Sequence, residues 1–345
     1  MTKIAVVGAG LFGIIIANKL AQIGKVDLYE KENDILSAAS GINQFRLHRG
    51  YHYPRSPETV RSNIESLNSF QKEFRKTIIR NVSHYYCIAK RDSFTTSQEY
   101  IDFCKRNNLE FTRADFGLVN KDKIDLCIKV KEQLIDPKKL KNLMLKKIER
   151  PNLKLFLGKS ADQKILKDYD RVIICTYASI NSLIEKRYQQ NYQYEICEKI
   201  VIRLPQTFKK KSIVILDGPF MCMDPYGSTG NHLLGNVVHA IHFSNIGKQP
   251  IIPSKFKKLL NQGIITNPPF SNFKKFLEST AAFIPDIKKA KYVGSMFTVR
   301  TVLPNKEKTD ERPTIIRKVD NKTITVFSGK LVSCMTAAAE VEKLI

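Results

Sequence analysis

The sequence of 345 residues lacks tryptophan, and its seven cysteines are scattered without a Cys-x-x-Cys pair. An odd number of dispersed cysteines is a poor disulfide framework, and without close pairs it is also a poor zinc site. We therefore expect a reduced, cytoplasmic protein that holds no metal.

The sequence also lacks an apolar run of the roughly 20 residues that span a bilayer. The longest candidate, residues 4–17, follows a short basic start and could pass for a signal peptide. Three glycines interrupt it, and it has no clear small-residue cleavage site. A folded strand, turn and helix explain it better, and we expect no transmembrane segment.

Acidic residues are scarce: 33 aspartates and glutamates oppose 57 lysines and arginines, which gives a formal net charge of +24. Such an excess can indicate binding to nucleic acid or membranes. The lysines are dispersed, however, and residues 209–211 are their longest uninterrupted run. The lysine-rich residues 138–147 are typical of the solvent-exposed face of a helix. Lysine has A/T-rich codons, so the base composition of the genome can explain much of the lysine excess. We predict no specific nucleic-acid binding, and a positive site that favours a small anionic substrate.

The first residues combine a short apolar run with a glycine-rich turn. Residues 3–7 form a short apolar run with β-branched residues that ends at a glycine, and residues 11–22 have helical composition. The glycines between them are spaced Gly8-x-Gly10-x-x-Gly13. Glycine here permits a tight turn, lets the backbone approach a pyrophosphate, and lets the helix pack closely on the sheet.

A carboxylate follows at the distance that this motif requires. Glu30 ends a second predicted strand, residues 26–30. An acid at this place accepts hydrogen bonds from the ribose hydroxyls of adenosine and disfavours the extra phosphate of NADP. The pattern predicts a bound dinucleotide contacted by Gly8, Gly10, Leu11, Phe12, Gly13, Glu30 and Lys31.

Proline at a first helical turn marks two later helices. Ser56 and Asp136 are candidate N-caps that precede proline, and they predict helices over 57–76 and 137–150. From about 192 to 243, strand-like runs alternate with Pro/Gly turns, which is typical of an antiparallel sheet. Other expected helices are 96–107, 254–262, 271–283 and 333–343, and other expected strands are 84–89, 153–157, 171–175, 195–204, 213–217, 232–243 and 292–300.

Residues 37–43 (SAASGIN) and 48–56 (HRGYHYPRS) resemble the D-amino-acid oxidase superfamily of FAD enzymes. Within it they are most similar to L-2-hydroxyglutarate dehydrogenase and its relatives, which carry His-x-Gly-x-x-Tyr-x-Pro-x-Ser. The resemblance implies FAD rather than NAD. It also implies that Ser40 and Asn43 contact the pyrophosphate and that His48 and Gly50 lie beside the flavin ring.

The same resemblance implies a fold of the α/β class. We expect a Rossmann-type FAD-binding domain with an interleaved antiparallel-sheet substrate domain, as in D-amino-acid oxidase and glutathione reductase. The expected FAD-binding domain comprises 1–80, 130–185 and 315–345, and the expected substrate domain comprises 81–129 and 186–314.

Two segments near the C-terminus extend the resemblance. Arg300, in the sequence VRTVLP of residues 299–304, resembles the arginine that binds the substrate carboxylate in amino-acid oxidases. A guanidinium suits a carboxylate because its planar donors form two parallel charge-assisted bonds. Residues 327–331 (FSGKL) resemble the Gly-Lys-Leu turn of FAD-linked glycerol-3-phosphate dehydrogenases. The resemblance implies that Ser328, Gly329, Lys330 and Leu331 contact the pyrimidine end of the flavin.

Two positions depart from the family pattern. Tyr177 stands where the family has a glycine after the strand 171–176, and Thr301 replaces the proline that usually follows the substrate-binding arginine. Local geometry at both places is therefore expected to differ from that of the family.

We predict an enzyme that transfers a hydride from an amino acid or 2-hydroxy acid to FAD, which oxygen or an electron carrier then reoxidises. His48, His52 and Arg300 are the expected catalytic residues. Arg49, Tyr226 and Arg300 are expected to bind substrate. The alternatives are a flavoprotein acting on an amino sugar or sugar nucleotide, and a non-catalytic FAD-binding protein. His239 and His242, three apart in the expected strand 232–243, should face opposite ways and share no metal.

Overall fold

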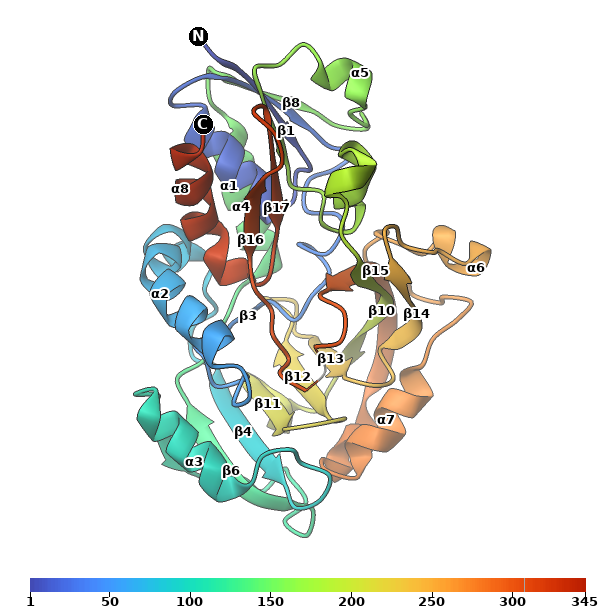
Figure 1. Ribbon diagram of the computed structural model, residues 1–345. Helices are drawn as coiled ribbons and strands as arrows, with labels where there is room; N and C mark the ends of the chain where they lie inside the picture. Colours follow the sequence, from blue (N-terminus) through green and yellow to red (C-terminus); the bar gives the residue numbers. More distant parts are fainter. Residues whose placement is uncertain (307) are drawn as a thin grey trace.

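A computed structural model describes residues 1–306 and 308–345. Within these residues the strands form two main sheets, one above the other in Figure 1, with most helices on their outer faces. This arrangement confirms the predicted α/β class.

The first sheet is the nucleotide-binding kind that the glycine motif predicts. Its strand order is β16–β17–β9–β1–β2–β8, and all neighbours pair in parallel except the edge strand β16. Parallel strands are buried on both faces, which is why these runs are almost continuously apolar. The bounds are β1 Lys3–Val7, β2 Lys25–Tyr29, β8 Leu153–Phe156, β9 Arg171–Ile174, β16 Ile315–Lys318 and β17 Thr323–Phe327.

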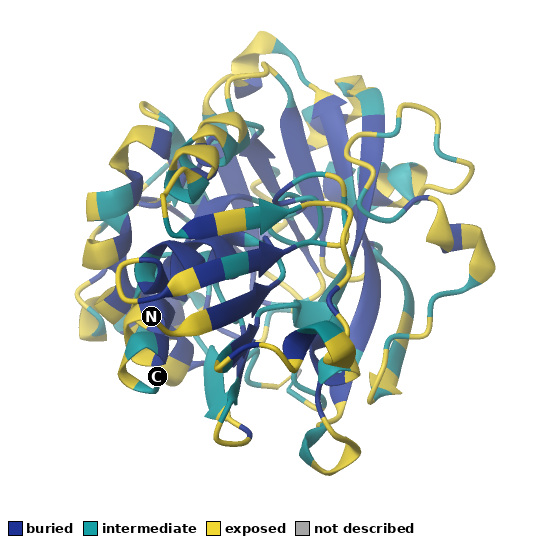
Figure 2. Ribbon diagram, turned by 90° about the horizontal axis from the view of Figure 1, so that it is seen from above, coloured by how far each residue is buried: buried dark blue, intermediate teal, exposed yellow. Residues whose placement is uncertain are grey.

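Four helices lie on one side of this sheet (Figure 1): α1 Leu11–Leu20, α2 Pro57–Phe74, α4 Pro137–Ile148 and α8 Cys334–Lys343. Helix α1 contacts both α4 and α8, so nearly all of its residues are buried, in keeping with its uniformly apolar sequence. The opposite face is covered by two 3-10 segments, η2 Tyr177–Leu183 and η3 Lys186–Tyr188. Figure 2 shows the buried strands at the centre and the exposed outer faces of the helices.

Helix starts follow the predicted capping residues. The Ser56 hydroxyl accepts a hydrogen bond from the Thr59 N–H at the start of α2, and the Asp136 carboxylate accepts two from the first turn of α4. Thr96 forms a reciprocal capping box with Glu99 at the start of α3, Ser97–Arg106. The remaining helices are α5 Gln163–Leu166, α6 Ser254–Lys257 and α7 Phe273–Ala281.

The second sheet is mainly antiparallel, as expected, and runs in the order β14–β10–β13–β12–β11–β4–β6–β5, with β15 on the other edge of β10. The pair of β4 with β11 is parallel. The bounds are β4 Ser83–Ala89, β5 Phe111–Arg113, β6 Ile124–Val130, β10 Tyr192–Arg203, β11 Lys211–Leu216, β12 Met221–Pro225, β13 His232–Asn236, β14 Ile241–Gly247 and β15 Lys291–Val302. A short pair, β3 Arg46–Leu47 and β7 Gln133–Leu134, completes the strands.

Two predicted elements are wrong. Residues 232–243 form two strands rather than one, because the Asn236 side chain accepts hydrogen bonds from the N–H groups of Val238 and His239 and so closes a turn. His239 therefore lies in a turn and not in a strand with His242. The expected helix 254–262 is the single turn α6, since a backbone N–H of Asn261 bonds to β15 instead.

The turn between β1 and α1 generates a prediction about stability. A Cβ on residue 13 would lie 1.8 Å from the carbonyl oxygen of Gly8, so Gly13→Ala should force the turn apart. We expect the free energy of unfolding to fall by about 1–3 kcal/mol, although alanine itself favours a helix. Urea denaturation measures this change.

Gly117→Ala is the matched control, because a Cβ there meets nothing within 4 Å. Equal stability of the Gly13 and Gly117 variants would contradict the close approach of α1 to the strand.

Candidate cofactor site and active site

One large cavity, of about 1060 Å³, lies between the two sheets. Its wall includes the carboxyl end of β1, the loop 36–48, the inner face of the second sheet and residues 327–331. Pockets for small molecules usually measure about 300–1,000 Å³, so this cavity can hold a dinucleotide together with a small substrate. Ligands of parallel sheets bind at this edge.

The glycine turn forms one end of the cavity. Gly8 has a left-handed φ of +101°, and a Cβ on it would lie 2.7 Å from the Cys175 carbonyl oxygen. Gly10 faces the Ser40 hydroxyl, and that hydroxyl accepts a hydrogen bond from the Leu11 N–H at the start of α1. Glycine backbone at a helix N-terminus is suited to a pyrophosphate.

The other residues predicted for this end have different places. Phe12 and Lys31 line the cavity, whereas Leu11 is buried and Gly13 packs against the Gly8 carbonyl. Asn43 lines the cavity, but its amide group bonds to the backbone of Ala39, Ser40 and Phe45. Asn43 therefore stabilises the 38–45 loop. The backbone groups that can bind a ligand at this end are those of the glycine turn.

Glu30 lies beside the glycine turn, as expected. Its carboxylate accepts one hydrogen bond from the Ala9 N–H at 2.7 Å and another from the Glu32 N–H at 3.0 Å. These bonds fix the carboxylate at the rim of the cavity, where it can accept further hydrogen bonds from a ribose.

Two histidines meet at the opposite end. The rings of His48 and His52 lie 5.1 Å apart, and each packs edge-on against Tyr53. The Nδ1 atom of each is buried without a hydrogen bond to a described residue. Burial lowers the pKa of both imidazoles well below 6.5, and neighbouring cations lower it further. Both rings are therefore neutral at pH 7 and can accept a proton.

Lys330 lies next to these histidines. Its Nζ stands 4.3 Å from the centre of the Tyr53 ring, and burial lowers the pKa of Lys330 to about 7. The segment around it needs glycine, because a Cβ on Gly329 would lie 2.1 Å from the Arg312 carbonyl oxygen. Ser328 and Leu331 also line the cavity, so all four residues predicted here face it. Gly50, in contrast, has its Cα against Val60 and is outside the cavity.

A buried polar network that we did not predict lies behind the histidines. Glu132 accepts hydrogen bonds from the Tyr86 hydroxyl and the Arg49 N–H, both at 2.7 Å, and lies 3.9 Å from His48 Nδ1. Burial raises the pKa of Glu132 to about 7. Arg46 donates to the same Tyr86 hydroxyl and pairs with buried Asp224. These residues are up to 178 positions apart, so no local pattern could have joined them.

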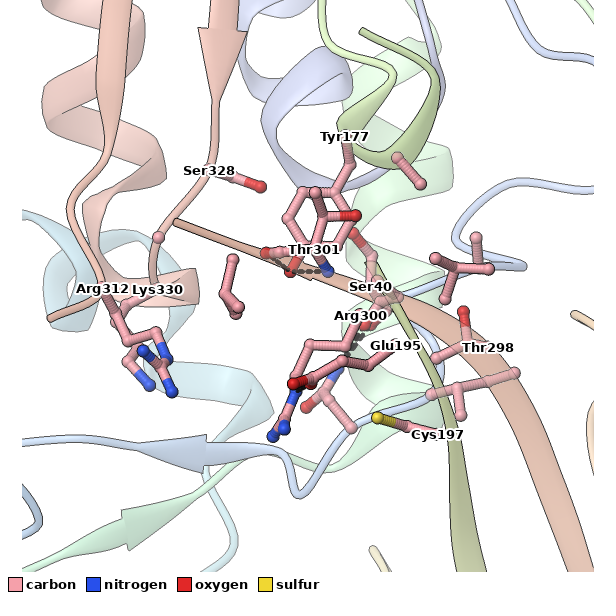
Figure 3. A pocket seen from close by; sticks show the side chains of 18 of the residues that line it. Ser40, Tyr177, Glu195, Cys197, Thr298, Arg300, Thr301, Arg312, Ser328 and Lys330 are labelled. Atoms are coloured by element: carbon pink, nitrogen blue, oxygen red, sulfur yellow. Dashed lines mark hydrogen bonds and ion pairs between the residues drawn. The ribbon is translucent and has the colours of Figure 1, made fainter. Parts of the chain in front are cut away.

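Arg300 and Glu195 form a cross-strand pair on the floor of the cavity (Figure 3). They are direct partners in the β10–β15 register, and Arg300 Nε donates to the Glu195 carboxylate at 2.5 Å. The Arg300 side chain is 40% exposed, and its two terminal amino groups have no hydrogen bond to a described residue. These groups remain available to a ligand.

Tyr177 and Thr301, the two departures from the family pattern, contact each other (Figure 3). The Tyr177 hydroxyl accepts a hydrogen bond from the Thr301 N–H at 3.0 Å and donates one to its carbonyl oxygen at 2.6 Å. Tyr177 adopts a left-handed φ of +51°, a conformation that glycine takes most readily. A proline at 301 would have no N–H to donate. The tyrosine thus holds the strand next to Arg300.

Two residues predicted to bind substrate lie elsewhere. Arg49 borders a small separate pocket and donates to the Lys131 carbonyl, and Tyr226 packs on Phe45 with its hydroxyl toward Met296. Tyr226 follows β12 and packs against the hydrophobic core. Neither residue lines the cavity.

Basic side chains outnumber acidic ones along the described cavity wall. Six cations have an acidic partner: Lys31 with Glu32, Arg46 with Asp224, Arg55 with Asp217, Arg300 with Glu195, Lys306 with Glu311, and Arg312 with Asp310. Lys159, Lys199 and Lys330 form no ion pair with a described residue. The cavity is therefore suited to an anion.

No helix in the described residues is long and apolar enough to cross a membrane.

Solved structures with the same fold include two oxidases. Glycine oxidase from Geobacillus kaustophilus has a TM-score of 0.71 and 14% identity, covering 100% of this chain and 95% of that one. L-α-glycerophosphate oxidase from Mycoplasma pneumoniae, with FAD bound, gives the same TM-score, identity and coverage.

Two fungal proteins are similar in sequence. FAD-dependent monooxygenase kojA of Aspergillus flavus is 24% identical over 261 residues, which is 67% of this chain and 60% of that protein. FAD-dependent monooxygenase FPY4 of Fusarium mangiferae is 25% identical over 244 residues, which is 69% of this chain and 64% of that protein. The chain thus spans less than two thirds of the length of either relative.

The profile of the FAD dependent oxidoreductase family, DAO, matches residues 3–224. This range contains the glycine turn, Glu30 and both cavity histidines. The match and the shared fold confirm the predicted superfamily, the Rossmann-type fold class and FAD as the cofactor. The chain belongs to the DAO family of FAD-dependent oxidoreductases.

Proposed function

We propose that this protein oxidises a small anionic substrate, of the amino-acid or 2-hydroxy-acid type, at a C–N or C–OH bond. The observation that carries the proposal is that one cavity joins a dinucleotide-binding turn to two neutral histidines, a buried lysine and an arginine. An enzyme that binds a small acid and removes a proton from it needs cationic groups to position the substrate and a neutral base to accept the proton.

The residues around the cavity fit FAD. The side-chain-free surface of Gly8 and Gly10, the start of α1 and the Glu30 carboxylate suit the pyrophosphate and ribose. At the other end, the buried amino group of Lys330 has no anionic partner among the described residues, and in its protonated form it suits the pyrimidine edge of a flavin. When bound, FAD supplies the hydride acceptor at N5 of its flavin ring.

The protein's own residues would orient the substrate and move its proton. The free amino groups of Arg300 would bind an oxyanion or another acceptor on the substrate. A substrate with a C–OH bond must lose the hydroxyl proton, and neutral His48 or His52 can accept it. A neutral amine needs no strong base. Oxygen or an electron carrier would be the final acceptor.

A second candidate is a monooxygenase, because both fungal relatives carry that name. Oxygen consumption with transfer of one oxygen atom to the product would favour this candidate. Oxidation without oxygen incorporation would favour the first proposal.

The first prediction concerns the cofactor. Purified protein should be yellow and release FAD when denatured, and Gly10→Val should prevent FAD binding, since the side chain would enter the space between Ser40 and the pyrophosphate. Absorbance and chromatography of the released chromophore measure this.

Gly117→Val, at a site with open space, should keep the FAD. Colourless wild-type protein that FAD cannot reconstitute would refute the cofactor assignment in this chain.

The second prediction concerns Arg300. Arg300→Ala should raise the substrate concentration for half-maximal anaerobic flavin reduction by more than about tenfold, because it removes the donors and leaves Glu195 unpaired. Arg300→Lys should restore binding only partly, since a point charge cannot reproduce the fork.

Glu195→Gln separates these two causes. The amide can still accept from Arg300 but carries no charge, so substrate binding should be unchanged or tighter. If Glu195→Gln weakens binding as much as Arg300→Ala does, the ion pair only maintains the local structure and Arg300 does not bind the substrate directly.

The third prediction concerns pH. Because burial lowers the pKa values of His48 and His52 well below 6.5, protonation of these imidazoles should slow the oxidation of a hydroxy acid only as the pH falls well below 6.5. His48→Asn or His52→Asn should slow flavin reduction by about 10²–10⁴ if that residue is the base. Unchanged rates in both variants would exclude both histidines.

A further inference from the structure

The cavity contains a positive charge that has no acidic partner among the residues that the structure describes. Burial is the main cause of the lowered pKa of His52, and four cations add to it: Arg46, Lys330, Arg312 and Lys199. Arg46 is paired with Asp224, Arg312 is paired with Asp310, and Lys330 belongs to the flavin end. Lys199 alone among these four has neither an acidic partner nor a ring contact in the described residues, and the proposed function gives it no role.

The strand β10 directs Lys199 into the cavity. Side chains alternate between the faces of a strand, and Gln193, Glu195, Cys197 and Lys199 all line the cavity. Glu198, its acidic neighbour, faces the other side, where it pairs with His242 and accepts a hydrogen bond from Ser271. Glu198 therefore cannot balance the charge of Lys199.

The position of Lys199 differs from that of Arg300. Arg300 lies opposite Glu195, four residues before Lys199 on β10, which is about 13 Å along a strand. The Lys199 charge is near His52 and also near Cys222 on β12, since it affects the pKa of both groups. Lys199 thus lies in the part of the cavity near His52, whereas Arg300 lies farther along the sheet and its charge is balanced by Glu195.

We propose that Lys199 binds an oxyanion group of the substrate, a carboxylate or a phosphate, and supplies the net positive charge that selects an anion. This proposal rests on the proposed function. Lys199 binds through charge, whereas Arg300 orients the substrate by hydrogen bonds. A half-buried ammonium that faces a cavity without a counter-ion is stabilised when an oxyanion enters.

The test uses the FAD-loaded protein and two probes, acetate and inorganic phosphate. Binding of each probe is followed by the change in flavin absorbance and, independently, by isothermal titration calorimetry. Lys199→Gln should weaken the better-bound probe by about ten- to a hundredfold, as expected for the loss of a hydrogen bond between charged groups. Lys199→Arg should stay within a few-fold of wild type. FAD content should be unchanged in both variants.

Lys291→Gln is the matched control, because it removes one positive charge from an exposed position at the start of β15, outside the cavity. It should bind the probes as wild type does. Tighter binding of acetate would identify a carboxylate site, and tighter binding of phosphate would identify a phosphate site.

Three results would overturn the proposal: no binding of either probe to wild type, equal binding by Lys199→Gln and wild type, or equal weakening by Lys291→Gln. The proposed function fails separately, if the protein binds no FAD or if no substrate reduces it. Calorimetry does not depend on the flavin, so an oxyanion site at Lys199 would still be detected in that case.

Discussion

The turn between β1 and α1 has no room for a side chain at Gly8 or Gly13, and the whole cofactor end depends on this constraint. The Gly8 carbonyl lies against Gly13, and the Gly8 Cα lies against the end of β9. The close approach fixes the start of α1 at the mouth of the cavity, where Ser40 accepts a hydrogen bond from its first N–H. It also brings the Ala9 N–H to Glu30, so the carboxylate and the helix start are held as one unit.

At the opposite end, the organising factor is the balance of buried charge. Arg46 carries its charge deep in the protein because Asp224, Ser212 and the Tyr86 hydroxyl surround it. The histidines in front of it are neutral, since a further charge beside Arg46 would be costly. Lys159, Lys199 and Lys330, which form no ion pair with a described residue, also line the cavity. A cavity in which most cations are paired, but some can still contact a ligand, is suited to anionic groups.

The family fold is shared with enzymes of different substrates, so the chemistry depends on the side chains around the cavity. The contact between Tyr177 and Thr301 illustrates this point. Each residue departs from the family pattern, and the two departures depend on each other. The Tyr177 hydroxyl accepts a hydrogen bond from the Thr301 N–H, which a proline would lack. The pair restrains the end of β15 and hence the backbone that carries Arg300.

Local sequence determined the dinucleotide-binding unit and the helix starts. The spacing of Gly8, Gly10 and Gly13 and the capping residues Ser56 and Asp136 act within a few residues, so a single sequence displays them. Through resemblance, the sequence also indicated FAD and the segments near His48 and Lys330. Only the tertiary structure decided which charges are paired. Glu195 balances Arg300 across 105 residues, Glu132 lies behind His48, and Lys199 has no acidic partner within residues 1–306 and 308–345. Strand register brings together residues that no local pattern connects.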